Sequence, residues 1–149
     1  MGKISGTAFG LVLLLLPVAC LADSGDDLLD AVIGNDNVKA AGLISQGADL
    51  NKTQPDGWTS LLFAVYNHNP ELARLLVEKG ADVNAREWRT GNTALMLAVA
   101  WGNAEIVGLL IQKGADINTR QRAGNTALSY AVSYQHDDIV QLLKKAGAQ

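Results

Sequence analysis

The side chains that most often perform nucleophilic, acid–base or metal chemistry are scarce in this chain of 149 residues, which has 2 histidines and 1 cysteine. Neither His68 nor His136 has cysteines or acids around it at the spacing of metal ligands. The acid pairs at 26–27 and 137–138 suit the first turns of helices, where the helix dipole favours negative charge. The sequence contains no Gly-x-Ser-x-Gly elbow, phosphate-binding loop or Rossmann fingerprint. We therefore expect no catalytic residue, metal or cofactor, and a small enzyme stays a remote alternative.

The composition favours a folded protein that binds other molecules. Apolar residues make up 48% of the chain and charged residues 18%, which excludes wholesale disorder. The 12 basic and 15 acidic residues give a formal net charge of −3, so the chain is no polycation built to neutralise phosphates. We expect no nucleic-acid partner.

A repeat organises the chain from about residue 23 onward. Gly-Ala-Asp triplets begin at residues 47, 80 and 114, and a final Gly-Ala begins at 147, so the steps are 33, 34 and 33 residues. Thr-x-Leu with a following alanine recurs from residues 59, 93 and 126. Several independent marks keep the same spacing, which predicts a stack of similar structural units.

Each unit is predicted to consist of two short helices and a turn. In the second unit the first helix is expected to run from near Thr59 to near Asn67. Asn69 and Pro70 suit the start of the second helix, as a cap and as the first helical residue. Gly80 lies just past that helix, where a residue without Cβ adopts the left-handed backbone most easily. In the fourth unit His136 takes the place of Asn69, so we expect a capping or surface role for it.

Two departures from strict repetition predict local differences. One extra residue within 87–90 should enlarge the hairpin between the second and third units. Lys144 stands where inner units have Val77 and Ile111, and a polar residue suits an outermost helix that no neighbour covers.

These marks resemble the ankyrin repeat family over about residues 23–149. The clearest copies are Gly57-Trp58-Thr59-Ser60-Leu61 with Ala64, and Gly80-Ala81-Asp82-Val83-Asn84-Ala85. The resemblance implies an all-α solenoid of about four helix-turn-helix units with short hairpin linkers, at about 23–55, 56–88, 89–122 and 123–149. It also implies a non-catalytic module that binds and scaffolds, stabilises or inhibits a partner protein, and we expect a monomer.

In that family the contact surface is built from hairpin tips and from exposed positions of each first helix. Carried over to this sequence, it predicts a strip of aromatic side chains, the type that dominates interface hot spots. The alternative is that some rings fold over neighbouring turns and serve packing alone. The tips are also basic at positions 86, 89, 120 and 122, which predicts an acidic patch on the partner, with ordinary solvated charge as the alternative. The predicted partner-binding residues are Trp58, Tyr66, Asn67, Trp88, Arg89, Trp101, Arg122 and Tyr134.

Residues 1–22 are typical of a secretory signal peptide. Lys3 carries the only charge before Asp23, and the apolar run at 8–16 is shorter than the roughly 20 residues of a membrane-spanning helix. Cleavage after Ala22 would give a periplasmic or secreted protein of a bacterial envelope. The alternative is a lipoprotein in which Cys20 is lipidated and tethers the chain to the membrane.

Overall fold

The computed structural model describes residues 24–149, so the predicted signal peptide and Cys20 lie outside the described residues. The described part forms eight helices and no strand. The helices are α1 (Ser24–Ile33), α2 (Asn37–Ser45), α3 (Ser60–Tyr66), α4 (Pro70–Glu78), α5 (Ala94–Ala100), α6 (Ala104–Gln112), α7 (Ala127–Ser133) and α8 (Asp137–Lys145).

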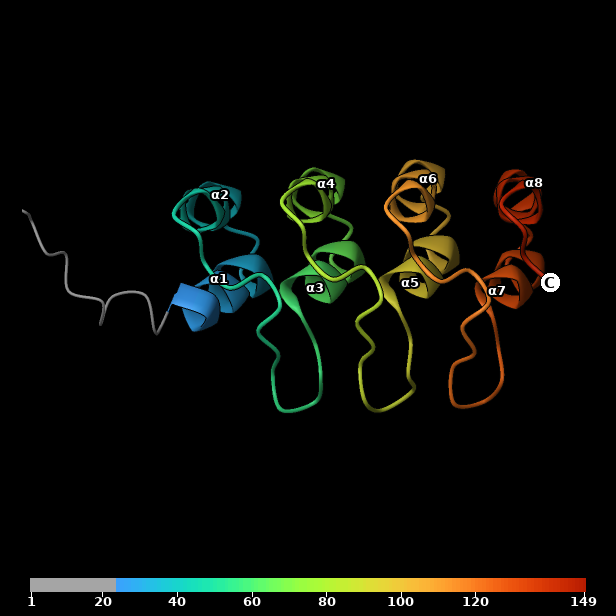
Figure 1. Cartoon of the computed structure of the whole chain (residues 1–149), viewed down its shortest axis with the longest axis horizontal. Helices are drawn as coiled ribbons and strands as arrows, with labels where there is room; N and C mark the ends of the chain where they lie inside the picture. The colour runs from blue at the N-terminus through green and yellow to red at the C-terminus, as the bar shows by residue number, and fades with distance from the viewer. Residues whose placement is uncertain (1–23) are drawn as a thin grey trace, which may run out of the picture.

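The helices stand in two rows (Figure 1), with α1, α3, α5 and α7 in the inner row and α2, α4, α6 and α8 in the outer row. Each inner helix packs on its outer partner and on the next inner helix, and each outer helix packs on the next outer helix. Three long loops project from the inner row on the side away from the outer helices. We call them hairpin 1 (46–59), hairpin 2 (79–93) and hairpin 3 (113–126). This arrangement confirms the predicted all-helical solenoid.

Capping side chains fix where the helices begin. Thr59 precedes α3, and its hydroxyl accepts a hydrogen bond from the backbone N–H of Leu62; threonines cap α5 and α7 in the same way. Asn69 caps α4 through the N–H of Leu72, as predicted. The capping role considered for His136 is wrong, because its side chain makes no cap hydrogen bond to α8. Its ring instead lies beside the turn at Gly102 of the preceding unit.

The core runs through all four units without interruption. Its fully buried side chains come from both rows of helices, and equivalent positions repeat from unit to unit: Leu28, Leu61, Leu62, Leu76, Leu95, Met96, Ile106, Leu110, Ile139 and Leu143. Each unit therefore buries apolar side chains both between its own two helices and against the neighbouring units, as a stacked array requires.

The fourth unit exposes side chains at positions that are buried in the inner units. Val99 is 0% exposed, whereas its equivalent Val132 is 58% exposed because no described unit covers it. Lys144 is exposed and its equivalent Val77 is buried, as the sequence predicted.

Hydrogen bonds from one asparagine in each hairpin tie neighbouring units together. Asn51 Oδ1 accepts from the backbone N–H of Asp82 at 2.8 Å, and Asn84 Oδ1 accepts from that of Asp116 at 2.7 Å. Asn118 does the same for Gln149 at 3.0 Å. Repeated contacts of this kind hold the hairpins in register.

Candidate functional site

Three aromatic rings from adjacent units meet on the surface, and we call them the aromatic cluster: Trp58, Tyr66 and Trp101. Trp58 and Tyr66 pack edge to face with ring centroids 5.3 Å apart, and Tyr66 and Trp101 do so at 6.2 Å. Tyr66 is 50% exposed and Trp101 47% exposed. Three of the predicted partner-binding residues thus lie side by side, each ring supported by the next.

Contacts beneath and beside the cluster hold its rings in place. Trp58 is half-buried and packs on Phe63, with ring centroids 5.0 Å apart. Phe63 in turn packs partly buried against the core. On the other side His68 lies against Trp101, with ring centroids 4.1 Å apart. These contacts preorganise the cluster, which reduces the entropy lost when a partner binds.

His68 has no predicted role in binding, yet its ring supports the cluster. Its backbone is left-handed with φ of 56°, and the equivalent residue of the third unit is Gly102 with φ of 71°. Alignment of the units could have found this position, because a glycine there marks a left-handed turn. This left-handed turn places the imidazole ring of His68 against Trp101.

Tyr134 occupies the position equivalent to Trp101 but joins the aromatic cluster only indirectly. Its ring stacks with Tyr130 at 6.1 Å and with His136 at 6.2 Å between centroids. A Cβ on Gly102 would lie 2.9 Å from Cε1 of His136, so this histidine fills the space beside the turn that follows Trp101. The ring contacts thus fall into two groups, one with Trp101 and one with Tyr134.

Trp88 lies apart from the cluster, at hairpin 2, and is 58% exposed. Its ring covers Gly57 of hairpin 1, where a Cβ would lie 2.5 Å from Cδ1 of the indole. Its backbone N–H donates to the carbonyl oxygen of Asp56 at 2.8 Å. Trp88 therefore folds over a neighbouring turn, which is the packing role considered as an alternative.

The predicted enlargement of hairpin 2 is confirmed, and a buried carboxylate organises it. Glu87 accepts hydrogen bonds from the backbone N–H groups of Arg89 (2.7 Å), Thr90 (2.8 Å) and Asn92 (3.1 Å), and from the hydroxyl of Thr90. Burial raises the pKa of Glu87, but the hydrogen bonds from Thr90, Asn92 and Arg89 outweigh burial and lower the pKa below its usual value. Sequence reasoning missed this residue, because its partners come together only in the folded hairpin.

The basic hairpin tips divide into two kinds of arginine. Arg86 donates to the carbonyl oxygens of Gly91 at 3.1 Å and Arg120 at 2.7 Å, and Arg120 donates to that of Gly124 at 3.2 Å. These two arginines hold the hairpins together. Arg89 and Arg122 are exposed, and neither forms an ion pair within residues 24–149.

The predicted partner-binding residue Asn67 donates its amide to the carbonyl oxygen of Val32 at 3.3 Å and is half-buried between units.

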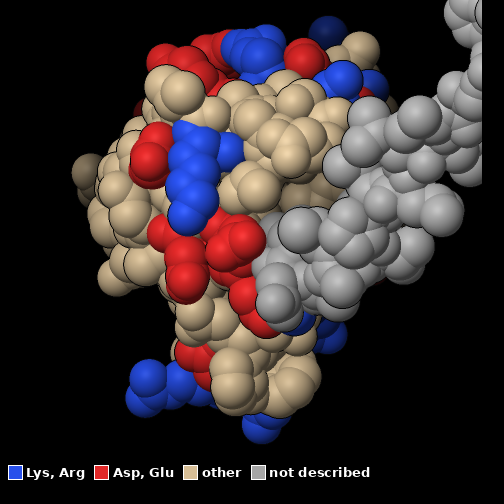
Figure 2. Space-filling model, turned by 90° about the vertical axis from the view of Figure 1, so that its left-hand side faces the viewer, with Lys and Arg blue, Asp and Glu red and all other residues tan. Residues whose placement is uncertain are grey.

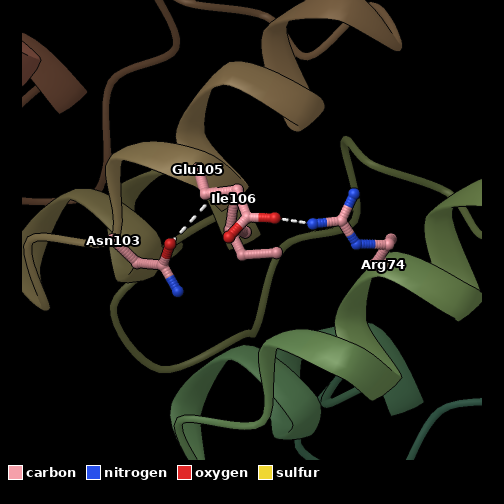
Figure 3. A network of polar contacts seen from close by, with 4 residues as sticks. All are labelled: Arg74, Asn103, Glu105 and Ile106. Carbon is pink, nitrogen blue, oxygen red and sulfur yellow. Dashed lines mark hydrogen bonds and ion pairs between the residues drawn. The ribbon is translucent and has the colours of Figure 1, made fainter.

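The ion pairs of the described residues lie elsewhere. On the outer row Arg74 of α4 pairs with Glu105 of α6, next to the Asn103 side chain that caps α6 through the N–H of Ile106 (Figure 3). At the N-terminal end Nζ of Lys52 lies 2.5 Å from Oδ2 of Asp26. Figure 2 shows acidic side chains gathered on this end, with basic side chains above them and on the hairpins below.

No helix among residues 24–149 combines the length and apolar character that a membrane span requires. The same residues contain no group of three or more histidine, cysteine or acidic side chains placed to hold a metal ion.

The chain matches the family model for ankyrin repeats over residues 28–121 and 86–149. It is 39% identical to the human mitochondrial disaggregase over 57 residues, which are 38% of this chain and 8% of that protein. It is 42% identical to the human NAD-capped RNA hydrolase NUDT12 over 48 residues, which are 32% of this chain and 10% of that protein. The matches thus span about a tenth or less of each relative.

Proposed function

The chain belongs to the ankyrin-repeat family, a family of protein-interaction modules, and from that premise we propose that it binds its partner through the aromatic cluster and the exposed arginines of the hairpins. The partner is a protein of the cell envelope. The action is stoichiometric: the solenoid scaffolds, stabilises or inhibits the protein that it holds.

The observation that carries the proposal is the exposure of ordered aromatic rings. Tyr66 and Trp101 each leave about half of their side chains in water while their ring positions are fixed by neighbours. Burying a large aromatic side chain at an interface removes much apolar surface from water at about 25 cal/mol per Å². Rings that are already ordered lose little side-chain entropy on binding, so they suit interface hot spots.

The polar side chains near the cluster support binding rather than catalysis. The one deeply buried carboxylate of this region, Glu87, uses its oxygens to accept hydrogen bonds that hold hairpin 2. The ankyrin-repeat family is also generally non-enzymatic. The hydrolase named among the relatives shares only the short matched segment with this chain.

We extend the proposal to the location of the protein. Removal of residues 1–22 would deliver a chain without cysteine to the periplasm or the cell exterior, where no thiol is left to mispair. The second possibility is a lipoprotein tethered through Cys20. Mass measurement of the mature chain separates the two, because cleavage after Ala22 leaves Asp23 as the first residue, whereas lipidation leaves a modified Cys20.

The binding proposal is tested by chemical crosslinking in intact cells, followed by mass spectrometry of the captured proteins. The combined change Tyr66→Ala and Trp101→Ala is expected to abolish capture of the main partner while helical content stays unchanged. Val38→Ala is the control, because Val38 lies on the outer row and is 86% exposed. Capture by the double variant at the level of the control would overturn the proposal.

A further inference from the structure

A pocket of about 290 Å³ lies between hairpins 1 and 2, beside the aromatic cluster. Trp58 and Tyr66 line it together with Leu97 of α5, and Arg89 and Asp56 lie at its edge. Pockets that enclose drug-sized ligands measure about 300–1,000 Å³. This pocket lies at the lower limit of that range, so its size suits one large side chain of a protein partner.

Hydrogen bonds hold hairpin 2, which forms one side of the pocket, both from within and from hairpin 3. Four hydrogen bonds to Glu87 fix the segment from Arg89 to Asn92. The backbone N–H of Arg122 donates to the carbonyl oxygen of Thr90 at 2.8 Å, which ties hairpin 2 to hairpin 3. The pocket is therefore formed before a partner arrives, and little ordering is needed on binding.

The charges at the pocket indicate which kind of partner residue lies next to the side chain that enters the pocket. Arg89 is exposed and has no ion-pair partner within residues 24–149, whereas the neighbouring carboxylate of Glu87 is occupied by hydrogen bonds. Arg122 on hairpin 3 adds a second exposed guanidinium. Asp56 lies at the pocket as well, and its carboxylate accepts a long hydrogen bond of 3.4 Å from the N–H of Trp58. The two exposed guanidinium groups thus lie on hairpins 2 and 3, and Arg89 is the one that lines the pocket.

We propose that this pocket takes an apolar side chain of leucine or phenylalanine size from an extended segment of the partner protein, with an acidic residue next to it in sequence that pairs with Arg89. The inference rests on the proposed function and names the chemistry that the surface recognises. The apolar side chain packs on Trp58 and Tyr66, and the acidic one forms a charge-assisted hydrogen bond with the guanidinium.

The test uses three synthetic peptides of equal length and ¹⁵N-labelled protein. One carries phenylalanine followed by glutamate between glycines, the second has glutamine in place of the glutamate, and the third has alanine in place of the phenylalanine. Titration is followed at the indole N–H of Trp58 and the backbone N–H of Asn92. The phenylalanine–glutamate peptide is expected to shift both signals, to bind roughly twofold to fivefold more tightly than the glutamine peptide, and to bind more tightly than the alanine peptide, which buries less apolar surface.

Arg89→Gln is expected to remove the preference for glutamate over glutamine and to leave binding of the glutamine peptide unchanged. Lys144→Gln removes the same charge from exposed α8 and is the matched control. It should alter neither the preference for glutamate nor the binding of the glutamine peptide. Equal affinity for the first two peptides, equal affinity for the first and third, or no shift at Trp58 at millimolar peptide would overturn the inference.

The crosslinking experiment distinguishes a failure of the pocket inference from a failure of the proposed function. If the peptides show no preference but the change of Tyr66 and Trp101 still abolishes capture, the pocket inference fails and the binding surface stands. If capture survives that double change, the proposed function itself fails.

Discussion

Tyr66 at the end of α3 and Trp101 at the end of α5 belong to adjacent repeats, and their rings meet edge to face with centroids 6.2 Å apart. Neither side chain is buried, so their contact depends on how closely the two inner helices stack. The aromatic cluster therefore exists only while the second and third repeats are in register. Changes that loosen this stacking are expected to weaken binding even where they touch no ring.

Replacement of Gly57 tests the packing of Trp88. Gly57 and Gly124 occupy equivalent hairpin positions with φ of 85° and 86°, but only Gly57 has a ring against it. Gly124→Ala should lower the free energy of unfolding by about 1 kcal/mol, the cost of a left-handed backbone for alanine. Gly57→Ala should cost more, because Trp88 must move, and should also change tryptophan fluorescence. Equal costs in urea denaturation would contradict the packing role of Trp88.

Loss of the Glu87 carboxylate should destabilise hairpin 2. Glu87→Gln removes charge-assisted hydrogen bonds and is expected to lower the free energy of unfolding by about 1.5–3 kcal/mol near neutral pH. The pKa of Glu87 is lowered in the folded chain, so its stabilisation is present above the unfolded pKa, near 4.5. It is lost as the pH falls through the folded pKa, because the protonated form binds the hairpin less well. The difference between the two proteins should therefore shrink in acid, and a difference that grows in acid would refute the assignment.

The two kinds of arginine are separable by mutation. Arg86→Gln loses hydrogen bonds to two backbone carbonyl oxygens and should cost about 1 kcal/mol of stability. Arg89→Gln removes an exposed guanidinium without an intramolecular ion pair and should leave thermal unfolding unchanged. Thermal denaturation of both variants checks the distinction, which fails if Arg89→Gln is the more destabilising change.

The asparagine of each hairpin should matter more inside the stack than at its end. Asn84 accepts from the N–H of Asp116 and donates to the carbonyl oxygen of Gly114, so Asn84→Ala should cost about 1–2 kcal/mol. Asn118 makes the same contacts to Gly147 and Gln149, in the last turn of the chain. Asn118→Ala is expected to cost less, because no further described unit packs against Gly147 and Gln149. The reverse order in chemical denaturation would show that the last turn is essential to the stack.

The parts of the fold that depend on neighbours in sequence could be predicted. Thr59, Asn69 and Gly80 act within one turn of their own helix, so residue type and spacing sufficed to place them. Of the two roles predicted for His136, capping is wrong because a cap also needs side-chain geometry, and its ring packs on the preceding unit instead. Glu87 could not be recognised because its four donors converge only after the hairpin folds.

For the candidate site, repeat alignment placed Trp101 and Tyr134 in equivalent positions but did not predict the contacts of the aromatic rings. Tyr66 meets Trp101 across the repeat boundary, whereas Tyr134 turns to Tyr130 and His136. These contacts depend on the orientation of each ring and on the space that neighbouring side chains leave. The spacing of residues in the sequence predicts neither.

The central claim is that the aromatic cluster contacts the partner, and site-specific photocrosslinking in intact cells tests it most directly. A photoreactive phenylalanine analogue is placed at Tyr66 in one strain and at Val38 on the outer row in another. We predict a single strong crosslinked partner from position 66 and none from position 38. The same partner captured equally from both positions, or from position 38 alone, would contradict the account.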